Sequence, residues 1–419
     1  MPAVFSTLEI RTECHLSLSR LVHLLLRNPR YTNAVRRVVL YEGELAEDFS
    51  FPFEWVLLAD AVRPLSPEND DLDDWMRSLQ GRTSGLPDLE WSISWQALLL
   101  SIVQNLKVLK FVAYHGSSHL DWLVERLSHG LDSFDGHPVF TRVQEVFISE
   151  HDLEWEPIEL HDIVPLLNLP LLRRFHCSGL LDNWYRDAKP FSFPNIRHLS
   201  FISSNSGNGF KKVVAGCKAL QTFEYQHSHQ PELGDDFNVP ALYPSLSKQK
   251  KTLEDLTVYN LHDYTGESPE NAFLGALKDF TALRKLRIRA DNLLDWSGAI
   301  GPSFAGTIPS SLKSLIIEYF DLYPRPLRFV DQIEDFARNR TPEDSQLESL
   351  QIRGDFMEQS RPDLSRQTPG RHFLDMKMQN VGLLLDNALG SSFSMRDYRL
   401  DTQLGWKTIP REWYSTSMN

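Results

Sequence analysis

The sequence predicts an α/β solenoid, a fold in which one short unit is repeated along a single axis. One observation is the recurring pattern apolar-x-x-apolar-x-apolar, of which Leu283-Arg284-Lys285-Leu286-Arg287-Ile288 is the clearest copy. Another is the spacing: from residue 143, successive copies start 29, 24, 24, 33, 30, 29 and 35 residues apart. A unit of this size can bury its apolar face only against its neighbours, so the units are expected to stack.

Each copy predicts one β-strand whose apolar side chains point into a shared core. The ten copies run through most of the chain and agree with one another, whereas a single copy would be weak evidence. Their apolar positions are Val35-Val38-Leu40, Leu106-Leu109-Phe111, Val143-Val146-Ile148, Leu172-Phe175-Cys177, Ile196-Leu199-Phe201, Leu220-Phe223-Tyr225, Leu253-Leu256-Val258, Leu283-Leu286-Ile288, Leu312-Leu315-Ile317 and Leu347-Leu350-Ile352.

Residues 1–34 are expected to form an N-terminal helical cap. Leucines recur at helical spacing over 16–28, and Asn28-Pro29 ends the helix. This helix would cover the apolar edge of the first strand, which is predicted at 35–40.

An acidic, irregular insertion at about 41–90 interrupts the solenoid. It holds 13 acidic and 3 basic side chains, so it contributes 3 − 13 = −10 to a net charge of −13. Short helices are predicted at 51–62 and 72–79. The acidic run 68–74 is expected to be a solvated loop or a helix start, because it lacks the glycine and closing glutamate of a calcium loop.

The units become regular from Ser92, and the solenoid is expected to extend over 35–355. Residues 356–419 are interpreted as a C-terminal cap and tail, in which a last helix at 376–389 closes the solenoid. Helices between the strands are predicted at 95–103, 119–131, 161–169, 211–217, 243–248, 272–280 and 329–338.

Composition and cysteine usage narrow the possible partners and compartment. An acidic chain does not suit nucleic acid or an anionic membrane surface, which both call for basic patches. The apolar runs are too short to span a bilayer, and no cleavable signal opens the chain. Three cysteines without a CxxC pair indicate free thiols in a reducing compartment, the cytoplasm or the nucleus. Cys177 occupies an apolar position and is expected to act as a small buried hydrophobe.

No group of residues in the sequence predicts catalysis, a cofactor or a metal. There is no glycine-rich phosphate loop and no GxSxG nucleophile elbow. The close histidine pairs, His115 with His119 and His227 with His229, lack a zinc-binding frame. The expectation is a non-enzymatic protein without cofactor.

The strand pattern resembles the leucine-rich-repeat family over roughly 35–355. That resemblance implies a horseshoe with parallel β-strands on the concave face and helices on the convex face. Asparagine or cysteine, which the family places after the strand, is mostly missing here; Asn260 is an exception.

The front end, Leu24-Leu25-Leu26-Arg27-Asn28-Pro29-Arg30-Tyr31 followed by the strand at 35–40, resembles fungal F-box-type leucine-rich-repeat proteins. This resemblance implies the substrate-recognition subunit of an SCF-type cullin ubiquitin ligase. Only 15 residues precede Leu16, and Thr7-Leu8-Glu9-Ile10 is not the Leu-Pro-x-Glu start of an F-box. The ligase adaptor is therefore expected as a partner only if an F-box exists upstream.

Binding is expected on the concave face, which the outward-pointing strand residues line. The candidate partner-binding residues are a group of cations beside one tyrosine, a composition typical of interface hot spots. The hypothesis is contact with an acidic segment of a partner protein; the alternative is that these charges only keep an open sheet face soluble and unpaired. The candidates are Tyr259, Lys285, Arg287, Arg289 and Arg353.

Overall fold

The computed structural model describes part of the chain, and the statements below concern that part. Contacts between Cα atoms divide the chain into two compact units. Unit 1 comprises Met1–Leu220 with Gln230–Asp236, and unit 2 comprises Gln221–His229 with Phe237–Asn419. The described residues are 6–10, 18–40, 52–66, 69–80, 87–113, 139–150, 158–182, 190–205, 208–228, 238–260, 273–294, 303–318, 326–341, 345–354, 384, 386 and 392–397.

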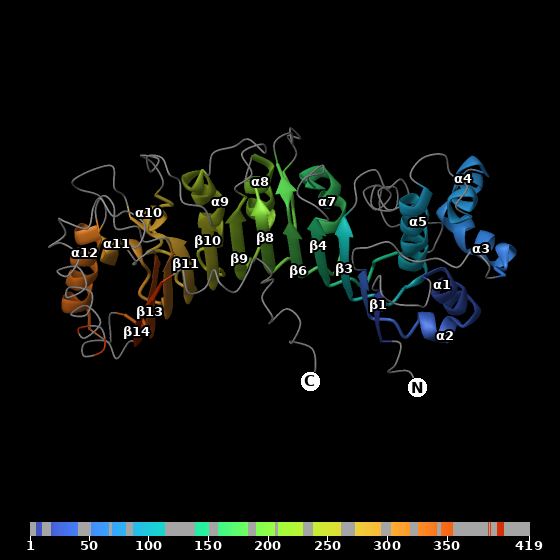
Figure 1. The fold of residues 1–419 in the computed structure, drawn as a ribbon. Helices are drawn as coiled ribbons and strands as arrows, with labels where there is room; N and C mark the ends of the chain where they lie inside the picture. The colour runs from blue at the N-terminus through green and yellow to red at the C-terminus, as the bar shows by residue number, and fades with distance from the viewer. Residues whose placement is uncertain are drawn as a thin grey trace, which may run out of the picture. The chain divides into compact units, whose positions relative to one another are not determined.

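Unit 1 contains a parallel sheet in which each predicted repeat contributes one strand (Figure 1). The register aligns the second apolar position of every repeat in one row, Leu8, Val38, Leu109, Val146, Phe175 and Leu199, and all six side chains are buried. Stacking of the row hides aliphatic and aromatic surface that no single repeat could cover. The strands, in sheet order, are β1 (Thr7–Ile10), β2 (Arg37–Leu40), β3 (Val108–Ala113), β4 (Glu145–Glu150), β6 (Arg174–Ser178) and β8 (His198–Ser204).

Two helices of unit 1 have carboxylates that accept backbone N–H groups at their first turn. The backbone N–H of Glu159 donates to Asp162 Oδ2 at 3.0 Å at the start of α7, and Phe210 N–H donates to the buried Asp182 Oδ2 at 2.6 Å near the start of α8. The elements are α1 (Leu18–Arg27), α2 (Pro29–Thr32), α3 (Trp55–Val62), η2 (Arg63–Leu65), α4 (Asn69–Leu79), α5 (Pro87–Ile102), α7 (Leu160–Leu167) and α8 (Asn208–Gly216), with a small parallel pair of β5 (Ile158–Glu159) and β7 (Leu180–Leu181).

Unit 2 contains a set of parallel strands aligned on an equivalent apolar row of its own. Leu256 pairs with Leu286, and Leu286 pairs with Leu315, which is the alignment that the repeat pattern requires. The row continues to Phe223 on one side and to Leu350 on the other. The strands, in order, are β9 (Thr222–His227), β10 (Asp255–Asn260), β11 (Lys285–Arg289), β12 (Ser314–Glu318), β13 (Ser349–Gly354) and β14 (Ser392–Asp397).

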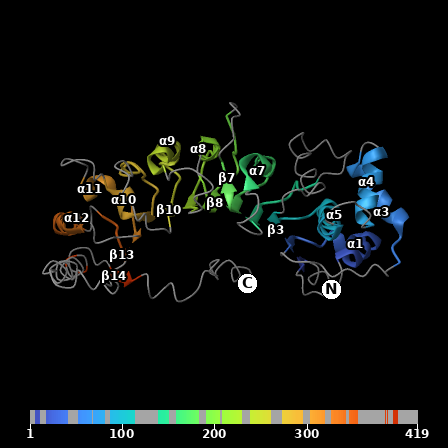
Figure 2. The ribbon, with the colours of Figure 1, turned by 45° about the horizontal axis from the view of Figure 1, so that its top comes forward.

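Short helices and 3-10 turns connect the strands of unit 2 and lie on one side of them (Figure 2). Phe304 contacts Phe329 and Phe336 edge to face, so α11 and α12 share a buried aromatic cluster. The elements are η5 (Val239–Leu242), α9 (Tyr243–Leu246), η6 (Ser247–Gln249), α10 (Ala290–Leu293), α11 (Phe304–Thr307) and α12 (Pro326–Asn339).

The helix predicted at 272–280 is wrong, because residues 273–280 are irregular. Gly275 has φ +126°, and a Cβ there would lie 2.4 Å from the Tyr243 ring. The N–H of Leu274 donates to Asn292 and that of Leu277 donates to Thr307, both through backbone carbonyls at 2.9 and 2.8 Å. These donors bond to neighbouring segments, so an i to i−4 ladder does not form.

Among the described residues, the short pair β5 and β7 lies outside the predicted set, and so do two strands of the long sheet. β1 precedes the first predicted strand, at 35–40, and β14 follows residue 355, the predicted end of the solenoid. The sequence at β1, Phe5-x-x-Leu8-x-Ile10, matches the repeat pattern in full. The sequence at β14, Gly390-x-x-Phe393-x-Met395, matches it except for glycine at the first position. The acidic run resolves as a helix start, since α4 begins at Asn69.

Some expectations remain predictions. The helix expected at 119–131 lies outside the described residues, as does the closing helix at 376–389 apart from residues 384 and 386. The domain boundaries expected at 34 and 355 are likewise still predictions.

Candidate protein-binding face

The open face of unit 2 consists of the strand side chains that alternate with the buried row. Asp255, Lys285, Ser314 and Ser349 share one register line, and Thr257, Arg287, Ile316 and Gln351 share the next. Alternation along each strand places these side chains away from the core. All five sequence-predicted site residues lie on this face, at 259 of β10, at 285, 287 and 289 of β11, and at 353 of β13.

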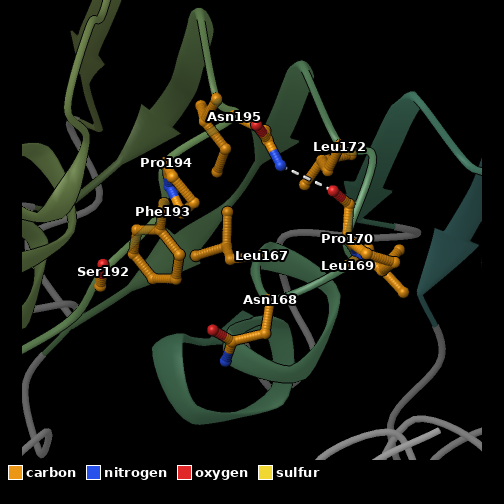
Figure 3. A pocket seen from close by; sticks show the side chains of 10 residues that line it. Leu167, Asn168, Leu169, Pro170, Leu172, Ser192, Phe193, Pro194 and Asn195 are labelled. Atoms are coloured by element: carbon orange, nitrogen blue, oxygen red, sulfur yellow. Dashed lines mark hydrogen bonds between the residues drawn. The ribbon is translucent and has the colours of Figure 1, made fainter.

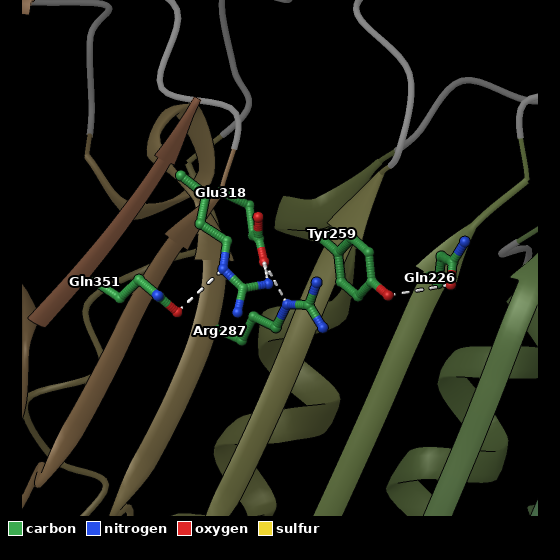
Figure 4. Close-up of polar contacts among 6 residues, drawn as sticks. Gln226, Tyr259, Arg287, Glu318 and Gln351 are labelled. Atoms are coloured by element: carbon green, nitrogen blue, oxygen red, sulfur yellow. Dashed lines mark hydrogen bonds and ion pairs between the residues drawn. The ribbon is translucent and has the colours of Figure 1, made fainter. Parts of the chain in front are cut away.

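Arg287 is held between an aromatic ring and a carboxylate (Figure 4). Its Cζ lies 4.2 Å from the centroid of the Tyr259 ring, and its Nε donates to Glu318 Oε1 at 2.5 Å. Tyr259 is itself fixed, because its hydroxyl donates to Gln226 Oε1 at 3.1 Å. Burial raises the pKa of the Tyr259 hydroxyl, although Arg287 opposes that shift, so the phenol stays protonated and able to donate.

Glu318 joins a second arginine to the first. Its side chain is 1% exposed, and the same Oε1 atom accepts from Arg353 Nη1 at 3.2 Å. Arg353 also donates through Nε to Gln351 Oε1 at 3.0 Å. One buried carboxylate thus orients two guanidinium groups from β11 and β13, and hydrogen bonds to charged groups are the strong ones.

Sequence reasoning missed Glu318, although a signal was present. Outward positions alternate along this strand from Ser314 to Ile316, and the same alternation reaches 318. Pairing confirms that Glu318 lies opposite Arg289. What the pattern could not show is that an outward carboxylate becomes completely buried.

Exposure separates the five candidates into accessible and buried residues. Lys285 is exposed, and the side chains of Arg287 and Arg353 are 30% and 21% exposed. Tyr259 is buried, and the side chain of Arg289 is 10% exposed and lies 3.8 Å from Asp291. Lys285, Arg287 and Arg353 are therefore accessible, whereas Tyr259, which packs against Arg287, and Arg289 are enclosed.

The surroundings of Lys285 are polar and nearly neutral. Asp255 pairs with it in register, and burial raises the pKa of this carboxyl while Lys285 opposes the shift. On the other side Ser314 accepts a hydrogen bond from Ser349 at 3.0 Å. This line offers a lysine and hydroxyl groups beside the two oriented arginines.

The open face of unit 1 has a different chemistry. Lys110 Nζ lies 4.5 Å from the centroid of the Phe147 ring, which lies 6.0 Å from the His176 ring. His176 Nδ1 is 3.0 Å from Ser200 Oγ. Burial, assisted by Lys110, lowers the pKa of His176 to about 4, so this imidazole is uncharged at neutral pH. This register line combines Phe147 and the uncharged His176 with Lys110 and, on the far side of Val39, Glu9.

A small cavity in unit 1 lies between the turns that precede β6 and β8 (Figure 3). Leu167, Leu172 and Phe193 are among its lining residues, and Asn195 Nδ2 donates to the Pro170 carbonyl at 2.7 Å. Its volume of about 60 Å³ would hold about two waters, each occupying about 30 Å³ in the liquid. Ligand pockets measure about 300–1,000 Å³, so this space is a packing gap between repeats.

Other chemically active groups are enclosed or scattered. Cys177 and Cys217 are buried free thiols, as expected for Cys177, and burial raises the pKa of Cys217 to about 12. Within the described ranges, no three His, Cys, Asp or Glu side chains gather in a way that could hold a metal ion. No helix among these residues is long and apolar enough to cross a membrane.

Parallel strands in register, one from each repeat and joined by short helices, define an α/β repeat protein of the solenoid class. Residues 136–319 match the family model of a leucine-rich repeat domain, which spans β4 to β12 and includes Lys285, Arg287 and Glu318. A search of curated proteins found no match. The leucine-rich repeat family is generally non-enzymatic, and its domains generally bind partner proteins, so the fold indicates a protein-protein interaction scaffold.

Proposed function

We propose that this protein is a non-enzymatic scaffold that binds an acidic segment of a partner protein on the open face of unit 2. Lys285, Arg287 and Arg353 would make the contact, and Tyr259 and Arg289 would support them. The observation that carries the proposal is the pair of partly exposed arginines oriented by one buried carboxylate. Guanidinium groups match carboxylates in shape and hydrogen bonding, and arginine is enriched among interface hot spots.

Charge supports an acidic ligand at this position. The chain carries a net charge of −13, whereas three arginines here outnumber the two carboxylates that contact them, Glu318 and Asp291. The adjacent Lys285 is a further exposed cation, and Asp255 lies beside it in register. Complementary charge steers association and fixes register more than it adds raw affinity.

The direct test is a charge reversal of Lys285→Glu with Arg287→Glu, measured by fluorescence anisotropy. The probe is a labelled peptide with Glu at every second residue, and its Gln analogue is the neutral control. We expect the wild type to bind the Glu peptide more tightly than the Gln peptide, and the double variant to lose this preference. The matched control, Lys251→Glu with Lys278→Glu, changes two exposed lysines away from this face and should bind normally.

Equal binding of the Glu and Gln peptides by the wild-type protein would refute the proposal. Proximity labelling with mass spectrometry, on the wild type and the charge-reversed protein, would then identify cellular partners. Arg289 is left unchanged because it is buried, and a glutamate there would disturb folding.

A second candidate is the substrate-recognition subunit of an SCF-type cullin ubiquitin ligase. It is supported by the resemblance at 24–40, where α1 is followed by α2 with Pro29 at its first position and then by β2. The same face would then bind the substrate. Translation of the genomic sequence upstream tests it: a Leu-Pro-x-Glu segment in frame would support this function, and its absence would count against it.

A further inference from the structure

We infer that Glu318 is a positioning residue of this face, which presents Arg287 and Arg353 as a fixed pair to a carboxylate of the partner. This inference rests on the proposed function and specifies how its ligand is recognised. It predicts that removing the negative charge of Glu318 weakens binding of an acidic ligand, although the face becomes more positive.

The geometry places both arginines on a single oxygen atom. Oε1 of Glu318 accepts from Arg287 Nε at 2.5 Å and from Arg353 Nη1 at 3.2 Å. The arginines come from β11 and β13, on either side of the strand that carries Glu318. The carboxylate therefore fixes the spacing of two side chains that would otherwise be long and flexible.

Further contacts complete the support of each arginine. The Tyr259 ring covers one face of the Arg287 guanidinium, so a ligand can reach this group at its edge or its other face. Gln351 Oε1 holds Arg353 through Nε. These contacts with Glu318, Tyr259 and Gln351 leave the side chains of Arg287 and Arg353 30% and 21% exposed.

Burial decides how Glu318 acts on a ligand. Its side chain is 1% exposed, so salt screens its ion pairs much less than it screens an exposed pair. Glu318 therefore orders the arginines at any ordinary ionic strength. A ligand that meets ordered guanidinium groups loses less conformational freedom on binding than one that must order them itself.

The two guanidinium groups, of Arg287 and Arg353, determine which class of ligand fits this face. A planar carboxylate accepts two parallel N–H donors from one guanidinium, and two fixed guanidinium groups suit either closely spaced acidic side chains or one carboxylate shared between them. An aspartate or glutamate in an extended segment of the partner fits this requirement.

Two models make opposite predictions for the variant Glu318→Gln. If net charge alone governs binding, the Glu peptide binds the variant more tightly. If Glu318 acts by positioning, the variant loses the charge that orders the arginines, and Kd rises roughly tenfold, the effect of losing one charge-assisted hydrogen bond.

The experiment compares Kd values for the Glu peptide across four full-length proteins besides the wild type. Glu318→Gln removes the negative charge, whereas Glu318→Asp keeps the charge on a shorter side chain. Gln351→Ala removes the other partner of Arg353 without changing any charge. Glu348→Gln is the matched control, because this exposed glutamate pairs with Lys313 away from the arginine pair.

We expect weaker binding for Glu318→Gln, Glu318→Asp and Gln351→Ala, and a Kd within about twofold of wild type for Glu348→Gln. Circular dichroism and thermal melts identify any variant that fails to fold. Gln351 is half-buried and uncharged, so Gln351→Ala keeps the test decisive even then.

Tighter binding by Glu318→Gln, or normal binding by both Glu318→Asp and Gln351→Ala, would overturn the positioning role and leave the proposed function intact. If the wild-type protein itself does not prefer the Glu peptide over its Gln analogue, the proposed function fails, and the positioning role fails with it.

Discussion

Each of the two units buries an equivalent apolar row, and the two units differ in the side chains on their open faces. Both align the second apolar position of each repeat, through Phe175 in unit 1 and Leu286 in unit 2. On the open face, unit 1 places Phe147 beside a neutral His176, whereas unit 2 places two arginines on a buried Glu318. The buried positions must remain apolar for the repeats to stack, while the outward positions can vary and are therefore where specificity arises.

The largest expected effect is a loss of unfolding free energy when a side chain of the buried apolar row is truncated. This loss should be similar in the two units. Phe175→Ala should cost about 3–5 kcal/mol of unfolding free energy and Leu286→Ala about 2–5 kcal/mol, because both side chains are fully buried. Urea unfolding followed by circular dichroism measures both. A loss below about 1 kcal/mol in either variant would mean that the row does not form the core of that unit.

The second prediction uses one histidine in each unit, the half-buried His176 and the buried His227. Burial lowers the pKa of His176 and of His227 to about 4 from the usual 6.5 of an exposed imidazole, so the unfolded chain binds more protons than the folded one between these values. The free energy of unfolding is therefore unaffected by these histidines above pH 6.5. It falls as the pH drops towards 4, by at most about 3 kcal/mol for each histidine.

Chemical denaturation at several pH values measures this loss. His227 is the more enclosed of the two, and its Nδ1 lies 2.8 Å from the Tyr225 hydroxyl. His227→Gln should therefore reduce the slope of stability against pH in this window. An unchanged slope would show that His227 is not held uncharged.

The smallest effect sharpens the contrast between the open faces. Lys110→Glu reverses the cation beside Phe147 in unit 1, and it should change the affinity for the Glu peptide by less than about twofold. It should cost only about 0.5–1 kcal/mol of stability through the lost cation–π contact. A large loss of peptide binding would instead place acidic-ligand recognition on unit 1.

Much of the fold could be predicted because its signal is local and repeated. Leu256, Leu286 and Leu315 recur at a fixed place in the pattern, and stacking of equivalent residues puts them in adjacent strands. The helix expected at 272–280 does not form, because the apolar residues there belong to an irregular segment. In this segment the Tyr243 ring packs so close to Gly275 that no side chain would fit at that position. That contact joins residues far apart in the sequence and leaves no periodic trace.

The candidate site was predicted in part. Alternation along the strands placed the five chosen side chains on one face, as the pairing of β10 to β13 confirms. Their burial could not be predicted, because the pattern treats Arg289 and Arg287 alike although one is nearly enclosed and the other is partly exposed. The role of Glu318 depends on side-chain reach across three strands, which sequence position does not encode.

The most direct measurement is a reciprocal charge exchange on the open face of unit 2. The protein with Lys285→Glu and Arg287→Glu is titrated with the Glu peptide and with a peptide that has Lys in place of Glu. We expect the variant to lose affinity for the Glu peptide and to gain affinity for the Lys peptide, while the wild type shows the reverse preference. Undiminished binding of the Glu peptide by the variant would contradict it.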